Sequence, residues 1–554
     1  MPITTDSALL KTLLHEGIFL MRDFHLPGRS TVLASNGMCA TSHPLATTAA
    51  IDVLKKGGNA VDAAVTGALL LGLCEPHMTG LGGDMFALIQ KNPSLDVIAL
   101  NGSGRAPKNL SATNLRKQGF STVPLNSVAS ITIPGAVDGF CQIMKDYGKL
   151  GLEEVLAPAI HYAREGIPVA PRVAFDWDEG ATRLQGTAVD KFLLNGAAPK
   201  MGQIFCSPTQ AQALELIASK GRDGFYDGPV AADMVESLQK LGGSHTLEDF
   251  LATKATYSTP LQSNYRGVEM LEHPANGQGA TALLMLNVMK HFQFSKLDPF
   301  GAKRAHIETE ISKFAYAARD KFIADLDYTN RISHMLASET ALNIADKINS
   351  KKAIKSLSTI SEAIHKDTVY ITVVDKDRMA VSLIYSIFHS FGSGIASKKY
   401  GILFQNRGAG FTLEQDHPNE LAGGKRPMHT IIPGMLAERG RVTMPFGVMG
   451  GGYQPKGHAR LLSNMLDFDL NIQEAIDGPR SFYENGVLKL ERGYVSNVRQ
   501  QLVEMGHKVQ IPSGPIGGAQ AIGALAFGTK QINNCLLYTS DAADEEDSVD
   551  LGGR

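Results

Sequence analysis

Cysteine is scarce in this sequence, with five residues among 554. No two of them have the CxxC spacing or the histidine neighbours of a metal-binding motif, and so few thiols in so long a chain form no disulfide framework. We therefore expect a reducing, cytoplasmic location. We also expect no metal and no other cofactor.

An excess of charge of either sign is missing as well. Lysine and arginine number 53 against 55 aspartate and glutamate residues, which gives a formal net charge of −2. No basic stretch is interleaved with aromatic side chains, so nucleic acid is not an expected partner.

Long uninterrupted apolar runs are also absent. The stretch from Ala8 to Met21 contains charged residues and precedes no small-residue cleavage site, so it does not have the pattern of a signal peptide. The run from Ala60 to Cys74 includes Asp62 and is shorter than the roughly 20 residues that a bilayer requires. We expect a soluble protein with no membrane partner.

The residues that are present indicate a large globular fold. Hydrophobic residues make up 44% of the chain, enough to bury a sizeable core, and no proline- or serine-rich linker divides it. Apolar residues recur at helical spacing from Pro44 to Leu73 around the Gly57-Gly58 turn, and residues 208–239 and 302–354 also have helical patterns. Met85–Gln90 is expected to be a strand.

A β-hairpin is predicted in the second half of the chain. Thr368–Val374 is rich in β-branched and aromatic residues, Asp375–Arg378 has turn residues, and Met379–Ile387 is the expected returning strand. A two-residue loop would place position 368 opposite 385, whereas a three-residue loop would place it opposite Ser386.

Thr368 is a candidate nucleophile because it begins this strand. If the preceding peptide bond is cut, its free α-amino group, with an ordinary pKa of about 7.7 to 8.0, can act as the base for its own hydroxyl. Ser386 would then hydrogen-bond that hydroxyl. The alternative from these residues alone is an ordinary threonine on a pleated strand.

Other catalytic motifs are missing. The glycines before Asp84 lack the third glycine of a dinucleotide-binding loop and precede a strand instead of a helix. The sequence has no GxxxxGK[ST], HExxH or GxSxG motif. Nicotinamide-linked redox, P-loop phosphoryl-transfer and zinc-protease functions are therefore disfavoured.

Several motifs, in order along the chain, resemble those of the γ-glutamyltransferase family of N-terminal-nucleophile (Ntn) hydrolases. The resemblance extends from about Ala34 to Gly528 and rests on Ser42–Ala46, Lys56–Ala64, Glu75–Gly83, Pro134–Gly139, Asp367–Thr368, Lys425–Pro427 and Glu474–Arg480. It implies an α/β fold built as a four-layer αββα sandwich.

The resemblance also implies a precursor that cuts itself between Asp367 and Thr368. Residues 1–367 would form a large subunit and residues 368–534 a small catalytic one, held together as an αβ heterodimer or as a dimer of such heterodimers. Thr368 would then attack a small-molecule amide and form an acyl-enzyme.

Further site residues follow from the same resemblance. Gly450 and Gly451 match the oxyanion hole, where backbone N–H groups stabilise developing negative charge. Ser103 replaces the arginine that clamps the substrate α-carboxylate in true transferases. Arg105 lies two residues on and either contacts an anionic substrate or is part of a surface salt bridge.

The contact for the substrate α-amino group is also altered, because Gly410 stands where transferases have an acid. His429 and Thr430 replace a pair of hydroxyl residues. These departures resemble the transferase-like branch that includes oxamate amidohydrolases, with cephalosporin acylases as a related possibility. The residues expected to line the pocket are Arg105, Ser103, His389, Arg407, His429, Thr430 and Gln454. For His389, Arg407, His429 and Gln454 the alternative is a structural role.

The C-terminal 20 residues differ in character from the rest. Residues 541–554 contain six acidic residues and one basic residue, and the stretch that starts at Cys535 resembles a translated sequencing adapter. We therefore expect residues 535–554 to be a non-native tail that follows a shortened natural C-terminus.

The predicted function is a self-processing amidohydrolase or acyltransferase that cleaves γ-glutamyl-type or other small carboxylate-bearing amides. An oxamate amidohydrolase or a cephalosporin-type acylase is the alternative within the same chemistry. Two other classes remain open, a binding scaffold that no longer processes itself and a serine hydrolase that uses Ser382 or Ser386.

Overall fold

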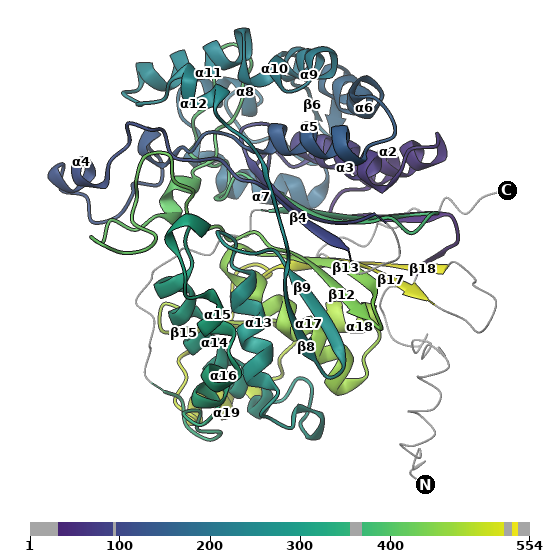
Figure 1. Cartoon of the computed structure of the whole chain (residues 1–554), viewed down its shortest axis with the longest axis vertical. Coiled ribbons are helices and arrows are strands. Elements are labelled where there is room, and N and C mark those ends of the chain that lie inside the picture. Colours follow the sequence, from purple (N-terminus) through teal and green to yellow (C-terminus); the bar gives the residue numbers. More distant parts are fainter. Residues whose placement is uncertain (1–31, 92–95, 355–367, 526–533, 541–554) are drawn as a thin grey trace.

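The computed structural model describes residues 32–91, 96–354, 368–525 and 534–540, and its centre is a pair of stacked antiparallel sheets (Figure 1). The six-stranded sheet has the order β2 (Gly37–Thr41), β10 (Val369–Asp375), β11 (Ala380–Ser386), β3 (Asp84–Gln90), β4 (Val97–Gly102) and β7 (Thr256–Ser258). The seven-stranded sheet has the order β1 (Val32–Ala34), β18 (Asn534–Ser540), β17 (Gly518–Leu525), β13 (Arg441–Met449), β12 (Pro433–Glu438), β9 (Val268–Glu272) and β8 (Leu261–Tyr265).

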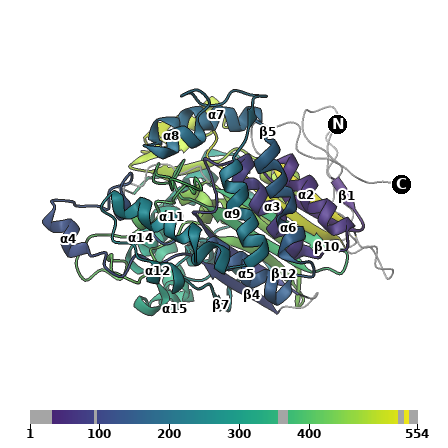
Figure 2. The same ribbon diagram turned by 90° about the horizontal axis from the view of Figure 1, so that it is seen from above.

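Helices cover the outer face of each sheet, as Figures 1 and 2 show. Over the six-stranded sheet lie α2 (Pro44–Lys55), α3 (Ala60–Cys74) and α5 (Ala136–Tyr147), followed outwards by α6 (Leu152–Glu165), α9 (Pro208–Lys220), α10 (Asp223–Tyr226), α11 (Pro229–Lys240) and α12 (Leu247–Leu251). Over the other sheet lie α13 (Gly279–Met289), α14 (Ala302–Phe322), α15 (Ile332–Leu336), α16 (Ser338–Ala345), α17 (Gln454–Phe468), α18 (Ile472–Asp477) and α19 (Ser496–Glu504). The predicted four-layer αββα sandwich is confirmed.

Smaller elements decorate these layers. They are α4 (Ala112–Lys117), α7 (Pro171–Gly180), α8 (Thr187–Phe192), the strand pair β5 (Ile167–Pro168) and β6 (Ile204–Phe205), and a three-stranded sheet of β14 (Ser481–Glu484), β15 (Val487–Leu490) and β16 (Val509–Gln510).

The helix–turn–helix predicted from Pro44 onward is confirmed as α2 and α3. All residues of α3 are buried, which explains why its sequence is apolar on every side. Its one charged residue, Asp62, caps the helix by accepting a hydrogen bond from the backbone N–H of Asn59 and others from Lys149 and Leu150. Among the residues described, no helix combines the length and apolarity needed to cross a bilayer.

The predicted hairpin is confirmed, and the structure decides its register. Val369 pairs with Tyr385 and Val374 with Ala380, which corresponds to the longer of the two expected loops. Arg378, the last residue of that loop, has a φ of 68°, the left-handed conformation that commonly closes such loops. Thr368 therefore lies opposite Ser386.

The two predicted subunits are interleaved in both sheets. Strand β2, which precedes the expected cleavage site, pairs with β10, which follows it, and β9 pairs likewise with β12. Apolar side chains from both subunits fill the space between the sheets, among them Leu88, Leu271, Val374 and Met435. Cutting the chain at 367/368 would leave these contacts intact.

Some predicted features lie outside the described residues, namely Ala8–Met21, Asp367 and the acidic residues 541–554. Residues 535–540, which the sequence analysis sets aside with the tail, are part of β18. This strand pairs with β17 on one side and with β1 on the other. A non-native origin of the tail stays a prediction, but its first residues do contribute backbone pairing to the sheet.

Candidate active site

The candidate site lies at one end of the six-stranded sheet, where several neighbouring strands begin or end together. Thr368 faces Ser386 across the hairpin, and Ser386 pairs directly with Asp84 of β3. Continuing the register of β3 and β4 by one residue places Ser103 beside Asp84. Opposed residues in an antiparallel sheet point to the same face, so these polar side chains form one row.

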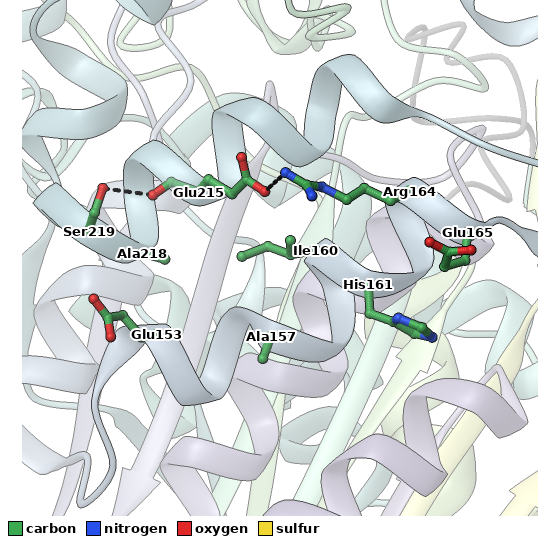
Figure 3. Close-up of a pocket in the computed structure, with 9 residues that line it drawn as sticks. All are labelled: Glu153, Ala157, Ile160, His161, Arg164, Glu165, Glu215, Ala218 and Ser219. Atoms are coloured by element: carbon green, nitrogen blue, oxygen red, sulfur yellow. Dashed lines mark hydrogen bonds and ion pairs between the residues drawn. The ribbon is translucent and has the colours of Figure 1, made fainter.

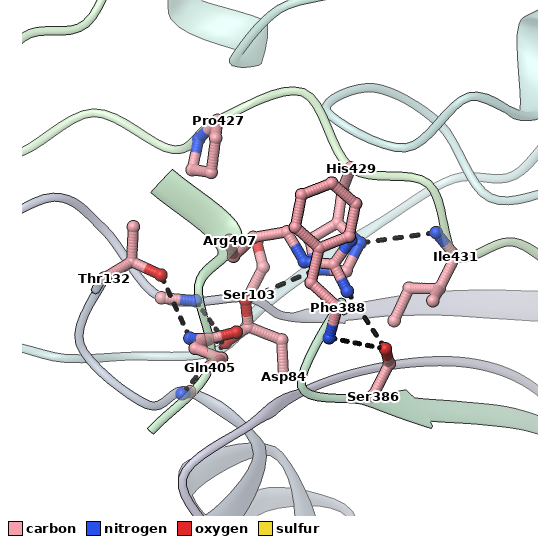
Figure 4. Close-up of polar contacts among 12 residues, drawn as sticks. Asp84, Ser103, Thr132, Ser386, Phe388, Gln405, Arg407, Pro427, His429 and Ile431 are labelled. Atoms are coloured by element: carbon pink, nitrogen blue, oxygen red, sulfur yellow. Dashed lines mark hydrogen bonds and ion pairs between the residues drawn. The ribbon is translucent and has the colours of Figure 1, made fainter. Parts of the chain in front are cut away.

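The hydroxyl of Thr368 is 3.5 Å from the hydroxyl of Ser386. Ser386 Oγ also accepts hydrogen bonds from the backbone N–H of Phe388, at 2.9 Å, and from the guanidinium of Arg407, at 3.1 Å (Figure 4). Thr368 is buried, with 1% of its surface exposed. The predicted pairing of these two hydroxyls is thus present, and the Arg407 guanidinium donates a hydrogen bond to the Ser386 hydroxyl of the pair.

Arg407 is a buried charge at the centre of the site. Its Nη1 donates to Thr430 Oγ1 at 2.9 Å, and its guanidinium carbon lies 4.1 Å from the centre of the Phe388 ring. Phe388 has a φ of 83°, an uncommon conformation for a bulky residue that places its ring over the guanidinium. The structure therefore brings together three residues that the sequence analysis placed in the site, Thr368, Ser386 and Thr430, around Arg407.

Asp84 is a site residue that the sequence analysis missed. Its Oδ1 accepts hydrogen bonds from the backbone N–H groups of Gly104 and Gly135 and from Gln405 Nε2, at 2.8 to 3.1 Å. Its Oδ2 lies 3.3 Å from His429 Nε2. The signal for it was its place after the glycine turn at the start of a predicted strand, but only the order of strands in the sheet brings it beside Ser386.

The two predicted site histidines are neutral groups at physiological pH. Burial, reinforced by Arg407, lowers the pKa of His429 to about 3, and the Asp84 carboxylate opposes this only in part. Burial also lowers the pKa of His389 to about 3, with Arg183 and Arg407 contributing. His389 Nδ1 lies 3.1 Å from Asn406 Oδ1. Neither histidine supplies positive charge for an anionic substrate.

The predicted oxyanion glycines lie just beyond the end of β13. Gly450 and Gly451 have φ values of 129° and 53°, which favour glycine. The ring of Tyr370, whose side chain shares a strand face with that of Thr368, lies against Gly447, so close that a methyl group there would be 2.2 Å from Cε2. This contact stacks the end of β13 over the start of β10.

The backbone N–H groups of these glycines are suited to an oxyanion. Within the described residues, neither Gly450 N–H nor Gly451 N–H donates a hydrogen bond to another group. Helix α17 begins three residues later, at Gln454, and its N-terminal dipole end favours negative charge nearby. Gln454 itself is buried and accepts a hydrogen bond from Ile432 N–H, so it binds the segment that follows Thr430.

Ser103 and Arg105 have different surroundings. Ser103 is buried and donates to Asn101 Oδ1 at 2.6 Å. Arg105 is 38% exposed along its side chain, and its Nη1 lies 3.0 Å from Asp325 Oδ2. The salt bridge that the sequence analysis gave as an alternative is therefore formed, and anion binding by Arg105 stays an untested prediction.

Ser382, the other candidate serine, is also buried. Its hydroxyl lies 2.7 Å from the Tyr370 hydroxyl and 3.1 Å from the Phe446 carbonyl oxygen, between the two sheets. No histidine or carboxylate is among these partners, so the contacts do not form a serine-hydrolase triad.

Two further features lie apart from this row. His306, Glu310 and His507 place one potential metal ligand atom each within 4.8 Å of the others, but the Lys313 ammonium already lies 2.7 Å from the Glu310 carboxylate and the two imidazoles contact each other at 2.8 Å. A groove of about 460 Å³ between α6 and α9 is lined by Glu153, Ala157, Ile160, His161, Arg164, Glu165, Glu215, Ala218 and Ser219 (Figure 3). None of the predicted site residues lines this groove.

Comparison with known proteins gives matches in sequence and in structure over most of the chain. A family model described as gamma-glutamyltranspeptidase matches residues 46–536. The glutathione hydrolase-like YwrD proenzyme of Bacillus subtilis is 35% identical over 87% of this chain and 92% of the relative. The oxamate amidohydrolase proenzyme of Klebsiella pneumoniae is 33% identical over 87% of this chain and 93% of the relative. The cephalosporin acylase from Bacillus halodurans superposes with a TM-score of 0.87 at 35% identity, over 94% of this chain and 97% of that one.

Because several buried histidines have lowered pKa values, we expect the protein to lose much of its stability in mild acid. Burial lowers the pKa of His389, His429 and His507 to about 3 and that of His43, His245 and His273 to about 4. The unfolded chain binds protons at these side chains near pH 6.5 whereas the folded chain does not, so stability is complete above pH 6.5 and falls as the pH is lowered. Between its unfolded and its folded pKa, each of these histidines lowers the free energy of unfolding by about 1.4 kcal/mol for each pH unit of acidification.

The measurement is the denaturation midpoint at a series of pH values from 7.5 to 5.0, for the wild type and for His429→Gln. We expect the wild-type midpoint to fall with decreasing pH, and the variant to show a shallower slope even if it is less stable throughout. A midpoint independent of pH over this range would contradict the neutral, buried state of these side chains.

Proposed function

The chain belongs to the gamma-glutamyltranspeptidase family of Ntn-hydrolases. We propose that it is a self-processing amidohydrolase or acyltransferase with Thr368 as its N-terminal nucleophile. Its proposed substrates are small amides whose acyl group carries a carboxylate. The observation that carries the proposal is the hydroxyl pair of Thr368 and Ser386, 3.5 Å apart and bound to a buried arginine.

Self-cleavage is the first proposed reaction. The hydroxyl of Thr368 attacks the carbonyl carbon of Asp367, the C–N bond breaks, and the acyl group moves to oxygen as an ester while the nitrogen becomes a free amine. Water then hydrolyses the ester, which leaves a carboxylate on Asp367 and a free amine and hydroxyl on Thr368. The proenzyme names of the relatives support this step.

Amide turnover is the second proposed reaction. The α-amine of Thr368 accepts the hydroxyl proton as the oxygen attacks the substrate carbonyl, and the proton then passes to the departing amine. The N–H groups of Gly450 and Gly451 stabilise the tetrahedral oxyanion, an effect typically worth about 10² to 10³ in rate per donor. Water or an acceptor amine then releases the acyl group from the ester.

The charge of Arg407 would favour the neutral, basic form of the Thr368 α-amine and the binding of an anionic acyl group. A fixed positive charge next to the α-amine disfavours its protonated form, so a larger fraction is available as base at neutral pH. The same charge attracts a carboxylate on the acyl group, because a guanidinium in a buried site interacts strongly with an anion. The charge of Arg105 is partly neutralised by its salt bridge with Asp325, so Arg105 attracts a carboxylate less strongly.

An acyl group with an additional ammonium group, such as γ-glutamyl, is less well matched. The carboxylate in the row, that of Asp84, is already surrounded by donors from Gly104, Gly135 and Gln405. Burying an ammonium without a partner costs several kcal/mol. We therefore favour acyl groups with a carboxylate alone, the class that includes glutaryl and oxalyl amides.

Replacement of Thr368 tests the nucleophile. Thr368→Ala is expected to stay uncut on a denaturing gel and to lose turnover by at least about 10³-fold, because both hydroxyl attacks disappear. Thr368→Ser retains a hydroxyl and an α-amine, so part of both reactions should remain. A cut and active alanine variant would exclude Thr368, and an uncut wild type inhibited by a fluorophosphonate would favour the serine-hydrolase alternative.

A matched set of anilides tests the substrate class. Glutaryl anilide and γ-glutamyl anilide differ only in the α-amino group, and pentanoyl anilide replaces the carboxylate of glutaryl by a methyl group. We expect kcat/KM to be highest for the glutaryl compound and at least about tenfold lower for each of the others, since each loses or adds one buried charge.

Arg407→Met should remove the advantage of glutaryl over pentanoyl anilide, and Arg407→Lys should retain part of it. Arg105→Gln is the control variant, because it removes the charge of the other arginine that the sequence places in the pocket. Its ratio of kcat/KM for glutaryl over pentanoyl anilide should equal that of the wild type. A ratio that changes with Arg105 and not with Arg407 would reverse the assignment of the anion contact.

A further inference from the structure

Gln278 lies directly before α13 and reaches the loop that follows β13. It is completely buried, and its Nε2 donates to the carbonyl oxygens of Gly451, at 3.0 Å, and Thr430, at 2.6 Å. Its Oε1 accepts a hydrogen bond from Arg319 Nη1 at 3.1 Å. Since an arginine is only a donor, this contact fixes which end of the amide carries the nitrogen.

The loop needs such contacts because it has no side chains of its own. Residues 450–452 are three consecutive glycines, and glycine has the largest backbone freedom to lose on ordering. Gln278 holds the carbonyl of Gly451, and the Tyr316 hydroxyl donates to the carbonyl of Gly452 at 2.5 Å. Two buried side chains from outside the loop therefore fix two successive peptide groups.

Gln278 also links two parts of the site. Through the Thr430 carbonyl it binds the residue whose hydroxyl accepts a hydrogen bond from Arg407, which in turn binds Ser386. One amide group thus contacts both the segment of the proposed oxyanion donors and the segment that holds the arginine.

We propose that Gln278, assisted by Tyr316, is a positioning residue that sets the geometry of the oxyanion hole for self-cleavage and for amide turnover. The proposal rests on the function proposed above, because it assigns the Gly450 and Gly451 N–H groups to the oxyanion. Gln278 acts through the backbone and touches no reacting atom. A preorganised donor acts mainly on the transition state, so its loss lowers kcat with little effect on KM.

The principal variants are Gln278→Met, which keeps the length of the side chain but removes the donors, and Tyr316→Phe, which removes one hydroxyl. Asn287→Met is the matched control, since Asn287 is a buried amide at the other end of α13 whose partners are Ser263, Lys290 and Leu336. Activities are divided by the amount of cleaved small subunit, so that slow maturation is not counted as slow turnover.

We expect Gln278→Met to lower kcat by about 10- to 100-fold with KM within about twofold of the wild type, and to slow self-cleavage by a similar factor. A boronic acid analogue of the acyl group, which forms a tetrahedral anion on the nucleophile, should bind more weakly by about the same factor. Tyr316→Phe should show the same pattern to a smaller extent, and Asn287→Met should keep the wild-type kcat even if it unfolds at a lower temperature.

The proposal is overturned if Gln278→Met keeps kcat and boronate affinity, or if KM alone changes. If Gln278→Met does not fold, Tyr316→Phe decides the question by the same two measurements, and unchanged values overturn the proposal. Failure of the proposed function looks different, because the wild type itself would then stay uncut or Thr368→Ala would stay active.

Discussion

The register of one hairpin determines the rest of the site. Because β10 and β11 pair with Thr368 opposite Ser386, and β11 pairs with β3 so that Ser386 meets Asp84, polar side chains from neighbouring strands share one face at one end of the sheet. A register shift of one residue would turn each of them to the opposite face. The backbone hydrogen bonds of the sheet thus fix the position of Thr368 independently of its side-chain contacts.

The second sheet and the connecting segments complete what the hairpin begins. The packing of Tyr370 against Gly447 brings the end of β13, and with it Gly450 and Gly451, over the start of β10. Arg407 enters from the connection between β11 and β12 and binds Ser386 and Thr430. All of these parts belong to the predicted small subunit, whereas Asp84 and Ser103 of the same row come from the predicted large subunit. Pairing of strands from both subunits in the sheet would keep this site together in a cut chain.

The sequence alone was sufficient for the fold class, the helix pair α2 and α3 and the hairpin, and it indicated Thr368 as the candidate nucleophile. Local signals reach no further than the hairpin. They leave two registers open, and the structure has the one whose loop ends with Arg378 in the left-handed conformation. They also do not indicate that β3 is the neighbour of β11, so Asp84 was missed. The neutrality of His429 depends on burial, and the contacts of Gln278 with Thr430 and Gly451 join segments more than a hundred residues apart. No local pattern reports either. The pairing of β18 was missed because composition alone described the tail.

The proposed mechanism requires that Thr368 becomes a chain end whose own amine activates its hydroxyl. The most direct test is the intact mass of the purified wild-type protein together with N-terminal sequencing of each chain. We expect two chains, the smaller beginning at Thr368, and labelling of that α-amine should abolish turnover. An active protein whose chain is still continuous from residue 367 to 368 would contradict it.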